Sequence, residues 1–169
     1  MNDSPENTPV KAGKAKPNSS LQKKAAARMA AVQSLYTLAI NGEKLSPAQQ
    51  VLILKKALAG NTDEQKLRVG NKVEPNYKLM ETILDGIEKR GLEINSRLDS
   101  TLNQEWKRER MSPLLLAILQ CGIFELFFDK DVNQKIILDE YTRLSRHFFA
   151  DAEVNFVHAA LSKLVRQYS

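Results

Sequence analysis

Few residues of this sequence have the chemistry and the spacing that catalysis or metal binding requires. The chain contains two histidines, His147 and His158, and one cysteine, Cys121. The histidines are not at metal-ligand spacing and the cysteine stands alone, so the pattern predicts neither a metal site nor an internal disulfide. No glycine-rich phosphate loop is present, and adjacent acids such as Asp139 and Glu140 point to different sides of a helix. The sequence therefore predicts a protein that is not an enzyme and uses no cofactor.

One acid, Glu125, lies in the most apolar segment of the chain, residues 113–128. A carboxylate among apolar side chains needs a partner, because burying it alone is costly. We expect a structural hydrogen bond or an ion pair to a facing helix. A catalytic acid is the alternative interpretation.

Positive charge gathers at the start of the segment LQKKAAARMAAVQSLY, residues 21–36. With an advance of about 100° per residue, Arg28 and Lys24 fall on the same stripe as the apolar Val32 further along the helix. A cation on a core stripe is costly unless the helix extends beyond the core at that point. The pattern therefore predicts that the first two turns project and offer Lys24 and Arg28, flanked by Lys23, to a partner.

Phe156 is the second candidate contact. It lies about 200° around its helix from Val154, away from the apolar stripe and on the side of Lys163. A large aromatic ring outside the core can stack on an unpaired base. The alternative is that Phe156 packs on a neighbouring helix. His158 falls nearer the apolar stripe, and we expect it to be a packing residue.

Helix signals divide the chain into seven segments. Ser46-Pro47 and Ser112-Pro113 are typical helix starts, and apolar residues recur at helical spacing after them. The expected helices span about 21–41, 46–60, 76–89, 92–103, 113–128, 134–148 and 151–167. The fifth is apolar on all sides, which places it at the centre. The apolar residues expected on the fourth are Leu92, Ile94, Leu98 and Leu102. We expect an all-α, compact seven-helix bundle made of two helical sub-bundles.

The charge is distributed unevenly along the chain. The net charge is +5, and residues 1–28 hold six cations against two acids. Residues 1–19 are rich in Pro, Asn, Ser and Lys, which predicts a disordered basic tail before a single helical domain over 20–169. This asymmetry suggests a polyanionic partner, most often nucleic acid, with a solubilising tail as the alternative. No membrane span or secretory signal is expected, and a single cysteine fits a reducing, cytoplasmic location.

Four segments together resemble the NusB transcription antitermination family. They are ARMAAVQSLY (27–36), ILQCGIFEL (118–126), DVNQKIILDEYTRLSRHFF (131–149) and FVHAALSKL (156–164). Each is moderately specific alone, but their order and spacing match over roughly residues 21–167. The resemblance implies a seven-helix fold of two sub-bundles. It also implies binding of the single-stranded boxA element of ribosomal RNA transcripts, together with the ribosomal protein NusE, so that RNA polymerase resists termination.

The resemblance also implies site residues. Transferred by position, the RNA contacts are Lys23, Lys24, Arg28, Gln33, Tyr36 and Phe156. The region around the start of the fifth helix usually faces NusE, and the residues assigned to it here are Glu109, just before the helix, and Leu115 and Leu116 within it.

The sequence departs from the family pattern at several of these positions. The Phe-Val-Asn-Gly motif is Phe156-Val157-His158-Ala159, and leucines replace an acid and a base at 115 and 116. Losing the amide and the glycine removes hydrogen-bonding capacity and close backbone approach, so RNA affinity is expected to be weaker. The alternative is a helical protein-interaction module or homodimer with RNA binding weakened or lost. NusB-like domains also occur fused to RNA methyltransferases, but we expect no room here for the cofactor-binding domain.

Overall fold

The computed structural model describes residues 19–60, 73–103, 105–129 and 131–168. Regular structure in these residues is entirely helical, which confirms the all-α prediction. The elements are α1 (Ser20–Asn41), α2 (Pro47–Leu58), α4 (Tyr77–Thr101), the 3₁₀-helix η1 (Arg108–Arg110), α5 (Pro113–Phe127), α6 (Gln134–Ser145) and α7 (Asp151–Gln167). The predicted tail lies outside the described residues except for Ser19.

Side-chain caps determine where most of these helices begin. The capping side chains, each accepting a hydrogen bond from a backbone N–H of the first turn, are Ser19, Ser46, Asn76, Ser112 and Asn133. Pro47 and Pro113 follow two of them at a position where a helix needs no N–H donor. At the other end of α1, Gly42 adopts φ 65°, a left-handed conformation that glycine accepts without strain.

The helix α4 runs through a kink at Arg90, the point at which the sequence predicts a break between two helices. Arg90 leaves helical geometry with φ −116° and ψ 21°, and the helix then resumes. Ile83 before this kink and Ile94 after it are both fully buried, so both halves pack on one core. The predicted count of seven helices is therefore wrong for the described residues, which form six α-helices and η1. Leu92 is 90% exposed because it lies about 200° around the helix from Ile94.

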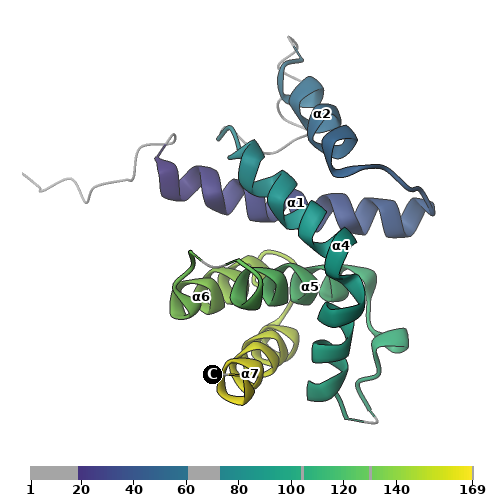
Figure 1. The fold of residues 1–169 in the computed structure, drawn as a ribbon, viewed down its shortest axis with the longest axis vertical. Coiled ribbons are helices and arrows are strands. Elements are labelled where there is room, and N and C mark those ends of the chain that lie inside the picture. Colours follow the sequence, from purple (N-terminus) through teal and green to yellow (C-terminus); the bar gives the residue numbers. More distant parts are fainter. Residues whose placement is uncertain (1–18, 61–72, 104, 130, 169) are drawn as a thin grey trace, which may run out of the picture.

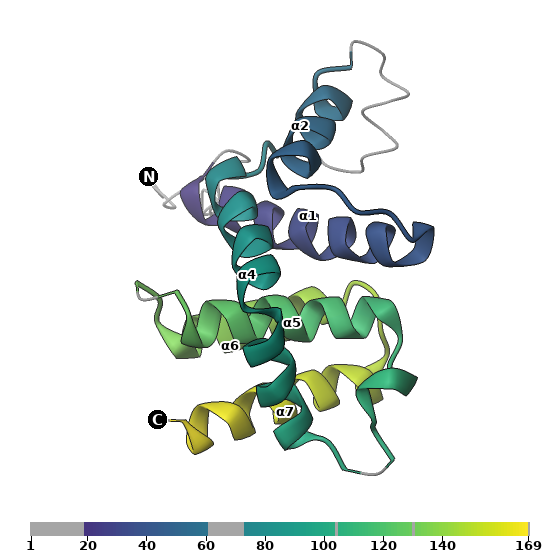
Figure 2. The same cartoon turned by 45° about the vertical axis from the view of Figure 1, so that its right-hand side comes forward.

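The central position of α5 is confirmed. It contacts α1, α4, α6 and α7, and most of its residues are buried. Figures 1 and 2 show α1, α2 and the first half of α4 grouped above it, with α6, α7 and the second half of α4 around and below. The kinked α4 is thus the helix that both groups share.

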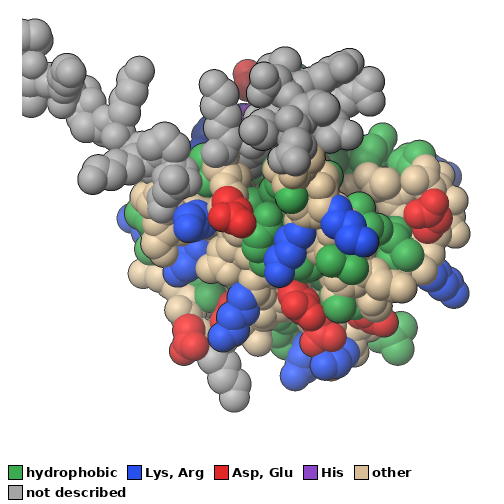
Figure 3. All heavy atoms as spheres, turned by 90° about the horizontal axis from the view of Figure 1, so that it is seen from above, with side chains coloured by type: hydrophobic (Ala, Val, Ile, Leu, Met, Phe, Trp, Pro, Cys, Tyr) green, Lys and Arg blue, Asp and Glu red, His purple; other side chains and the backbone are tan. Residues whose placement is uncertain are grey.

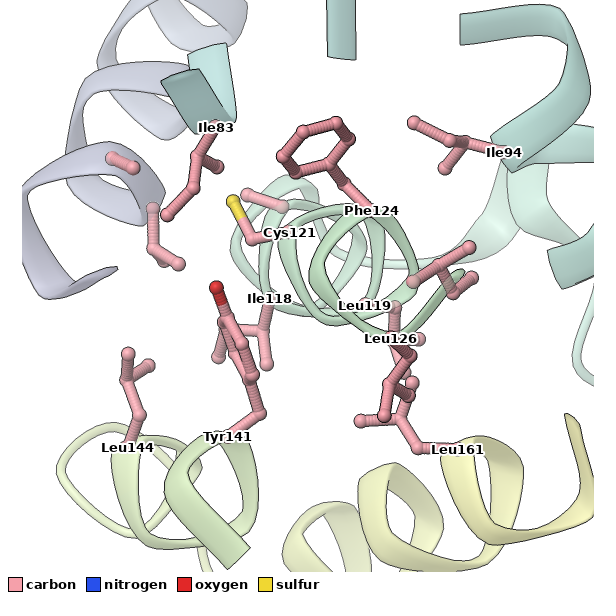
Figure 4. Packing of buried hydrophobic residues seen from close by; sticks show 14 of the residues in the cluster. Ile83, Ile94, Ile118, Leu119, Cys121, Phe124, Leu126, Tyr141, Leu144 and Leu161 are labelled. Carbon is pink, nitrogen blue, oxygen red and sulfur yellow. The ribbon is translucent and has the colours of Figure 1, made fainter. Parts of the chain in front are cut away.

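The core surrounds α5 on both sides. Figure 4 shows Ile83 and Ile94 of α4 on one side of α5, and Tyr141 of α6 and Leu161 of α7 on the other. A Cβ atom at Gly86 of α4 would lie 2.0 Å from the Phe124 ring of α5. Since real Cβ atoms do not approach rings this closely, α4 and α5 cross at a point where only glycine fits.

The surface is mixed in character where it can be seen from above. On that face, Figure 3 shows lysine and arginine side chains interspersed with acids and apolar groups. Positive charge is therefore not gathered into one patch on the visible part of this face. Within the described ranges, every helix is too short or too polar to cross a bilayer.

Candidate nucleic-acid interface

The first turns of α1 place Lys23 and Lys24 differently. Lys24 is exposed, as predicted, and Lys23 is half-buried. The Lys23 carbonyl accepts a hydrogen bond of 2.9 Å from the backbone N–H of Asn76, which joins the start of α1 to the start of α4. Lys23 and Tyr77 line a hollow of about 460 Å³ at this junction. Both lysines therefore remain accessible to a partner, although this end of α1 is not free of the rest of the fold.

Arg28 is not at the surface, so the prediction that it projects from the core is wrong. Its side chain is buried, with the residue 8% exposed. The guanidinium donates to both carboxylate oxygens of Glu125, from Nε at 2.8 Å and from Nη2 at 3.1 Å. The Tyr141 hydroxyl donates to the same carboxylate at 2.5 Å, and Glu140 lies 3.9 Å from Arg28 Nη1. The cost of burying a cation is offset by these partners rather than avoided by projection.

This buried ionic centre, defined by Arg28, Glu125 and Tyr141, joins α1, α5 and α6. Figure 4 shows the Tyr141 ring rising from α6 beside α5. Burial and the neighbouring Glu125 charge raise the pKa of Tyr141 well above 10.0. Burial opposes the charge of Arg28, but its hydrogen bond and ionic attraction to Glu125 still raise the pKa of the guanidinium above its ordinary value. The expected structural partner for Glu125 is confirmed, and that partner is Arg28.

A basic cluster that sequence reasoning missed lies at the end of α6. Arg143 and His147 line a small pocket of about 70 Å³ together with Glu140, Leu144 and, from α1, Ala25, Arg28 and Met29. Arg143 of α6 and His147, just after α6, are both exposed, although Arg143 Nη1 lies 3.5 Å from Glu140 Oε1. Lys24 is one turn before Arg28 on the same side of α1. We call Lys24, Arg143 and His147 the basic rim. The segment RLSRH carries cations three and four residues apart, a signal that could have indicated this face.

The remaining predicted contacts on α1 lie towards its C-terminal half. Gln33 and Tyr36 are both exposed, in agreement with a surface role. The Gln33 carbonyl accepts a hydrogen bond of 2.9 Å from the hydroxyl of Thr37, one turn later. These two side chains are therefore accessible from solvent, on faces of α1 that differ from that of Lys24.

Phe156 is half-buried rather than pointing freely into water. Its ring stacks on the indole of Trp106, with ring centroids 4.5 Å apart and planes 17° from parallel. The packing alternative is therefore correct: the ring packs against the hydrophobic core of the helices and also stacks on Trp106, a residue between α4 and η1. Trp106 is 39% exposed and was missed in the sequence. His158 is exposed too, and its Nδ1 lies 3.3 Å from the Thr142 hydroxyl.

The predicted NusE-facing residues are split between surface and core. Leu115 is only 3% exposed, so its prediction as a partner contact is wrong: α5 is apolar on all sides and turns Leu115 inward. Glu109 is exposed, and Leu116 is half-buried. Both line a groove of about 460 Å³ between α1, α4 and the start of α5, whose other lining residues are Leu35, Ala39, Asn95, Arg108, Met111, Pro113, Ala117 and Gln120.

The groups most able to bind a metal are dispersed. Among the residues that the structure describes, no three His, Cys, Asp or Glu side chains come together in a way that could hold a metal ion. Cys121 is fully buried, and burial raises the pKa of its thiol well above 9.0. A protonated, enclosed thiol is a poor nucleophile and a poor ligand.

The fold is an all-α domain built around one central helix, and its surface carries cations and a stacked aromatic pair. The chain belongs to the NusB family, whose model matches residues 25–166. The transcription antitermination protein NusB of Maricaulis maris (strain MCS10) is 31% identical over 141 residues, which covers 83% of this chain and 84% of that protein. The corresponding protein of Sinorhizobium fredii (strain NBRC 101917 / NGR234) is 28% identical over 167 residues, covering 99% and 96%. The resemblance found in the sequence is thereby confirmed.

Solved structures share the fold. A crystal structure of the antitermination factors NusB and NusE in complex with dsRNA superimposes with a TM-score of 0.66 at 20% identity, covering 85% of this chain and 96% of that chain. The solution structure of NusB from Aquifex aeolicus gives a TM-score of 0.60 at 20% identity, covering 85% and 88%. These likenesses show a common architecture.

Proposed function

We propose that this protein is a non-enzymatic, cytoplasmic transcription antitermination factor. It binds a boxA-type single-stranded RNA of ribosomal RNA transcripts together with NusE, and so acts within an RNA polymerase complex. The observation that carries this proposal is the family match over residues 25–166, with named relatives that are antitermination proteins.

The surface of α1 and α6 supports RNA binding. Lys23, Lys24 and Arg143 carry positive charge, His147 lines the same pocket as Arg143, and Gln33 and Tyr36 are exposed further along α1. Contacts from cations to phosphates give affinity and orientation without reading sequence. Arg28 takes no part, since its charge is neutralised inside the protein by Glu125. The stacked pair of Phe156 and Trp106 supplies the contact to an unpaired base.

The groove that contains Glu109 and Leu116 is the proposed NusE surface. Its lining is mostly apolar and includes the polar side chains of Arg108, Glu109, Asn95 and Gln120. Interfaces of this kind combine an apolar centre with a polar edge. A related NusB has been crystallised with NusE and dsRNA, which favours the same pair of partners here.

The test is a fluorescence anisotropy titration with a labelled boxA-like oligomer, a scrambled oligomer of equal length, and NusE present or absent. We expect boxA to bind more tightly than the scrambled control, and NusE to strengthen that binding. With three to six phosphates neutralised, the logarithm of affinity should fall against the logarithm of salt with a slope of about −2 to −4. Equal and weak binding of both oligomers, with or without NusE, would refute the proposal. A stable dimer indifferent to RNA in light scattering would then favour the interaction-module alternative.

A further inference from the structure

Trp106 and Phe156 come from distant parts of the chain and meet as a parallel stack. Trp106 lies between α4 and η1, and Phe156 lies in the second turn of α7. Their ring centroids are 4.5 Å apart with an interplanar angle of 17°. At this separation one face of the Phe156 ring is fully occupied by the indole, and no base can enter between them.

The two rings differ in what they offer to a ligand. Phe156 is half-buried and packs against the hydrophobic core. Because Trp106 also covers one face of its ring, Phe156 has little surface left for a base. Trp106 is 39% exposed. We propose that Trp106 is the residue on which an unpaired RNA base stacks, and that Phe156 is a positioning residue that supports the indole from below. This inference rests on the proposed RNA-binding function and assigns its base contact to a residue outside the predicted site.

The backbone of Trp106 is held in place before any ligand arrives. The Asn103 side-chain oxygen accepts hydrogen bonds from the backbone N–H groups of Glu105 at 3.0 Å and Trp106 at 3.1 Å. Two residues later, the Arg108 guanidinium donates to both carboxylate oxygens of Asp99 on α4, at 3.1 and 3.3 Å. With the segment fixed on both sides of it, the indole is preorganised, so that binding loses little conformational freedom.

The charges beside Trp106 are mixed. Lys107 and Arg110 follow it and are exposed, but so are the acids Glu105 and Glu109, and Arg108 is already paired with Asp99, so only the two free cations could contact phosphates. Proteins that bind single strands combine an aromatic ring for a base with nearby cations for the adjoining phosphates. The indole is also the aromatic side chain with the strongest attraction for cations and the largest stacking face, which makes it suitable for any of the four bases.

Intrinsic fluorescence gives a direct test, since Trp106 is the only tryptophan of the sequence. The unmodified full chain is titrated with the boxA-like oligomer while tryptophan emission and anisotropy of the RNA label are followed together. We expect emission to fall in step with binding and without a red shift, because a base covers an indole that does not move. An RNA duplex of the same length has no free bases and should leave the emission unchanged.

Substitutions give the second measurement. W106A should weaken binding of the single strand about 5- to 150-fold, the loss expected for one base stack, and W106F should retain most of the affinity. If the base stacks on Phe156 instead, W106A uncovers that ring and binding should strengthen. Far-ultraviolet circular dichroism checks that each variant is folded. If W106A does not fold, the tryptophan emission of the unmodified protein alone tests whether a base stacks on Trp106.

The outcomes separate this inference from the proposed function. RNA binding with unchanged emission, or with unaltered affinity in W106A, overturns the role of Trp106 and leaves the function standing. A red shift on binding also overturns it, since the indole has then moved into water. Failure of every oligomer to bind, with NusE present, refutes the proposed function and this inference with it.

Discussion

Arg28 and Lys24 lie one turn apart on the same side of α1, and yet one belongs to the buried ionic centre and the other to the basic rim. At Arg28 the helix packs on α5, where Glu125 and Tyr141 surround the guanidinium. At Lys24 the side chain reaches solvent. The difference shows that a cation on the core side of a helix is accommodated either by reaching solvent or by pairing with a buried acid. Both arrangements occur on α1 within about 6 Å of its length.

The largest expected effect is on the buried ionic centre. Glu125→Ala leaves Arg28 buried without its main partner, which should lower the free energy of unfolding by about 3–5 kcal/mol. Urea denaturation followed by circular dichroism measures this. The exposed pair of Lys89 and Asp85, with a 2.8 Å contact on α4, supplies the matched control. Asp85→Ala should leave the urea midpoint essentially unchanged, and equal shifts for the two variants would contradict the comparison.

A smaller loss is expected from Tyr141→Phe, which removes one hydrogen bond to the Glu125 carboxylate and costs about 1.5–3 kcal/mol at neutral pH. The pKa of Tyr141 is raised in the folded protein, so above about pH 10 the unfolded chain loses this proton first. Stability of the unmodified protein therefore falls there by up to about 1.4 kcal/mol per pH unit from this group, and the phenylalanine variant lacks that contribution. The difference in unfolding free energy between the unmodified protein and the Tyr141→Phe variant, measured by urea titration, should shrink from about pH 9 to about pH 11. A constant difference would show that Tyr141 is not held neutral.

The smallest effect on stability is expected at the basic rim. Lys24→Ala combined with Arg143→Ala should change the unfolding free energy by no more than about 0.5 kcal/mol. The same pair should make the salt slope of RNA binding shallower by about 0.7 for each phosphate that is no longer neutralised. Lys135→Ala removes an exposed cation from the first turn of the same helix α6 and serves as the control. An unchanged salt slope in the double variant, or an equal change in slope with Lys135→Ala, would show that the basic rim does not contact the RNA.

Local signals in the sequence predicted the helices well. Ser46-Pro47 and Ser112-Pro113 start α2 and α5 as expected, and Asn41-Gly42 ends α1. These features act within a few residues, so sequence alone contains them. The predicted break between residues 89 and 92 coincides with the kink of α4 at Arg90, but local signals did not predict that the two halves continue as one element packed on α5.

The candidate site was predicted less completely, and for a physical reason. The charge stripe on α1 and the isolated Glu125 were both recognised, but no local rule joins residues that are far apart in the chain. For the same reason the stack of Trp106 on Phe156 and the position of Arg143 beside α1 were missed. Lys24 is exposed as predicted, and Gln33 and Tyr36, which the resemblance alone indicated, are exposed as well.

The crossing at Gly86 has a consequence for how such sequences can diverge. Because the Phe124 ring fills the space where a Cβ atom would lie, neither position can drift independently while the two helix axes keep their present distance. A homologue with alanine at the first position should carry a smaller side chain at the second, or else hold its helices further apart. Paired changes at these two positions would therefore record how closely each descendant packs α4 against α5.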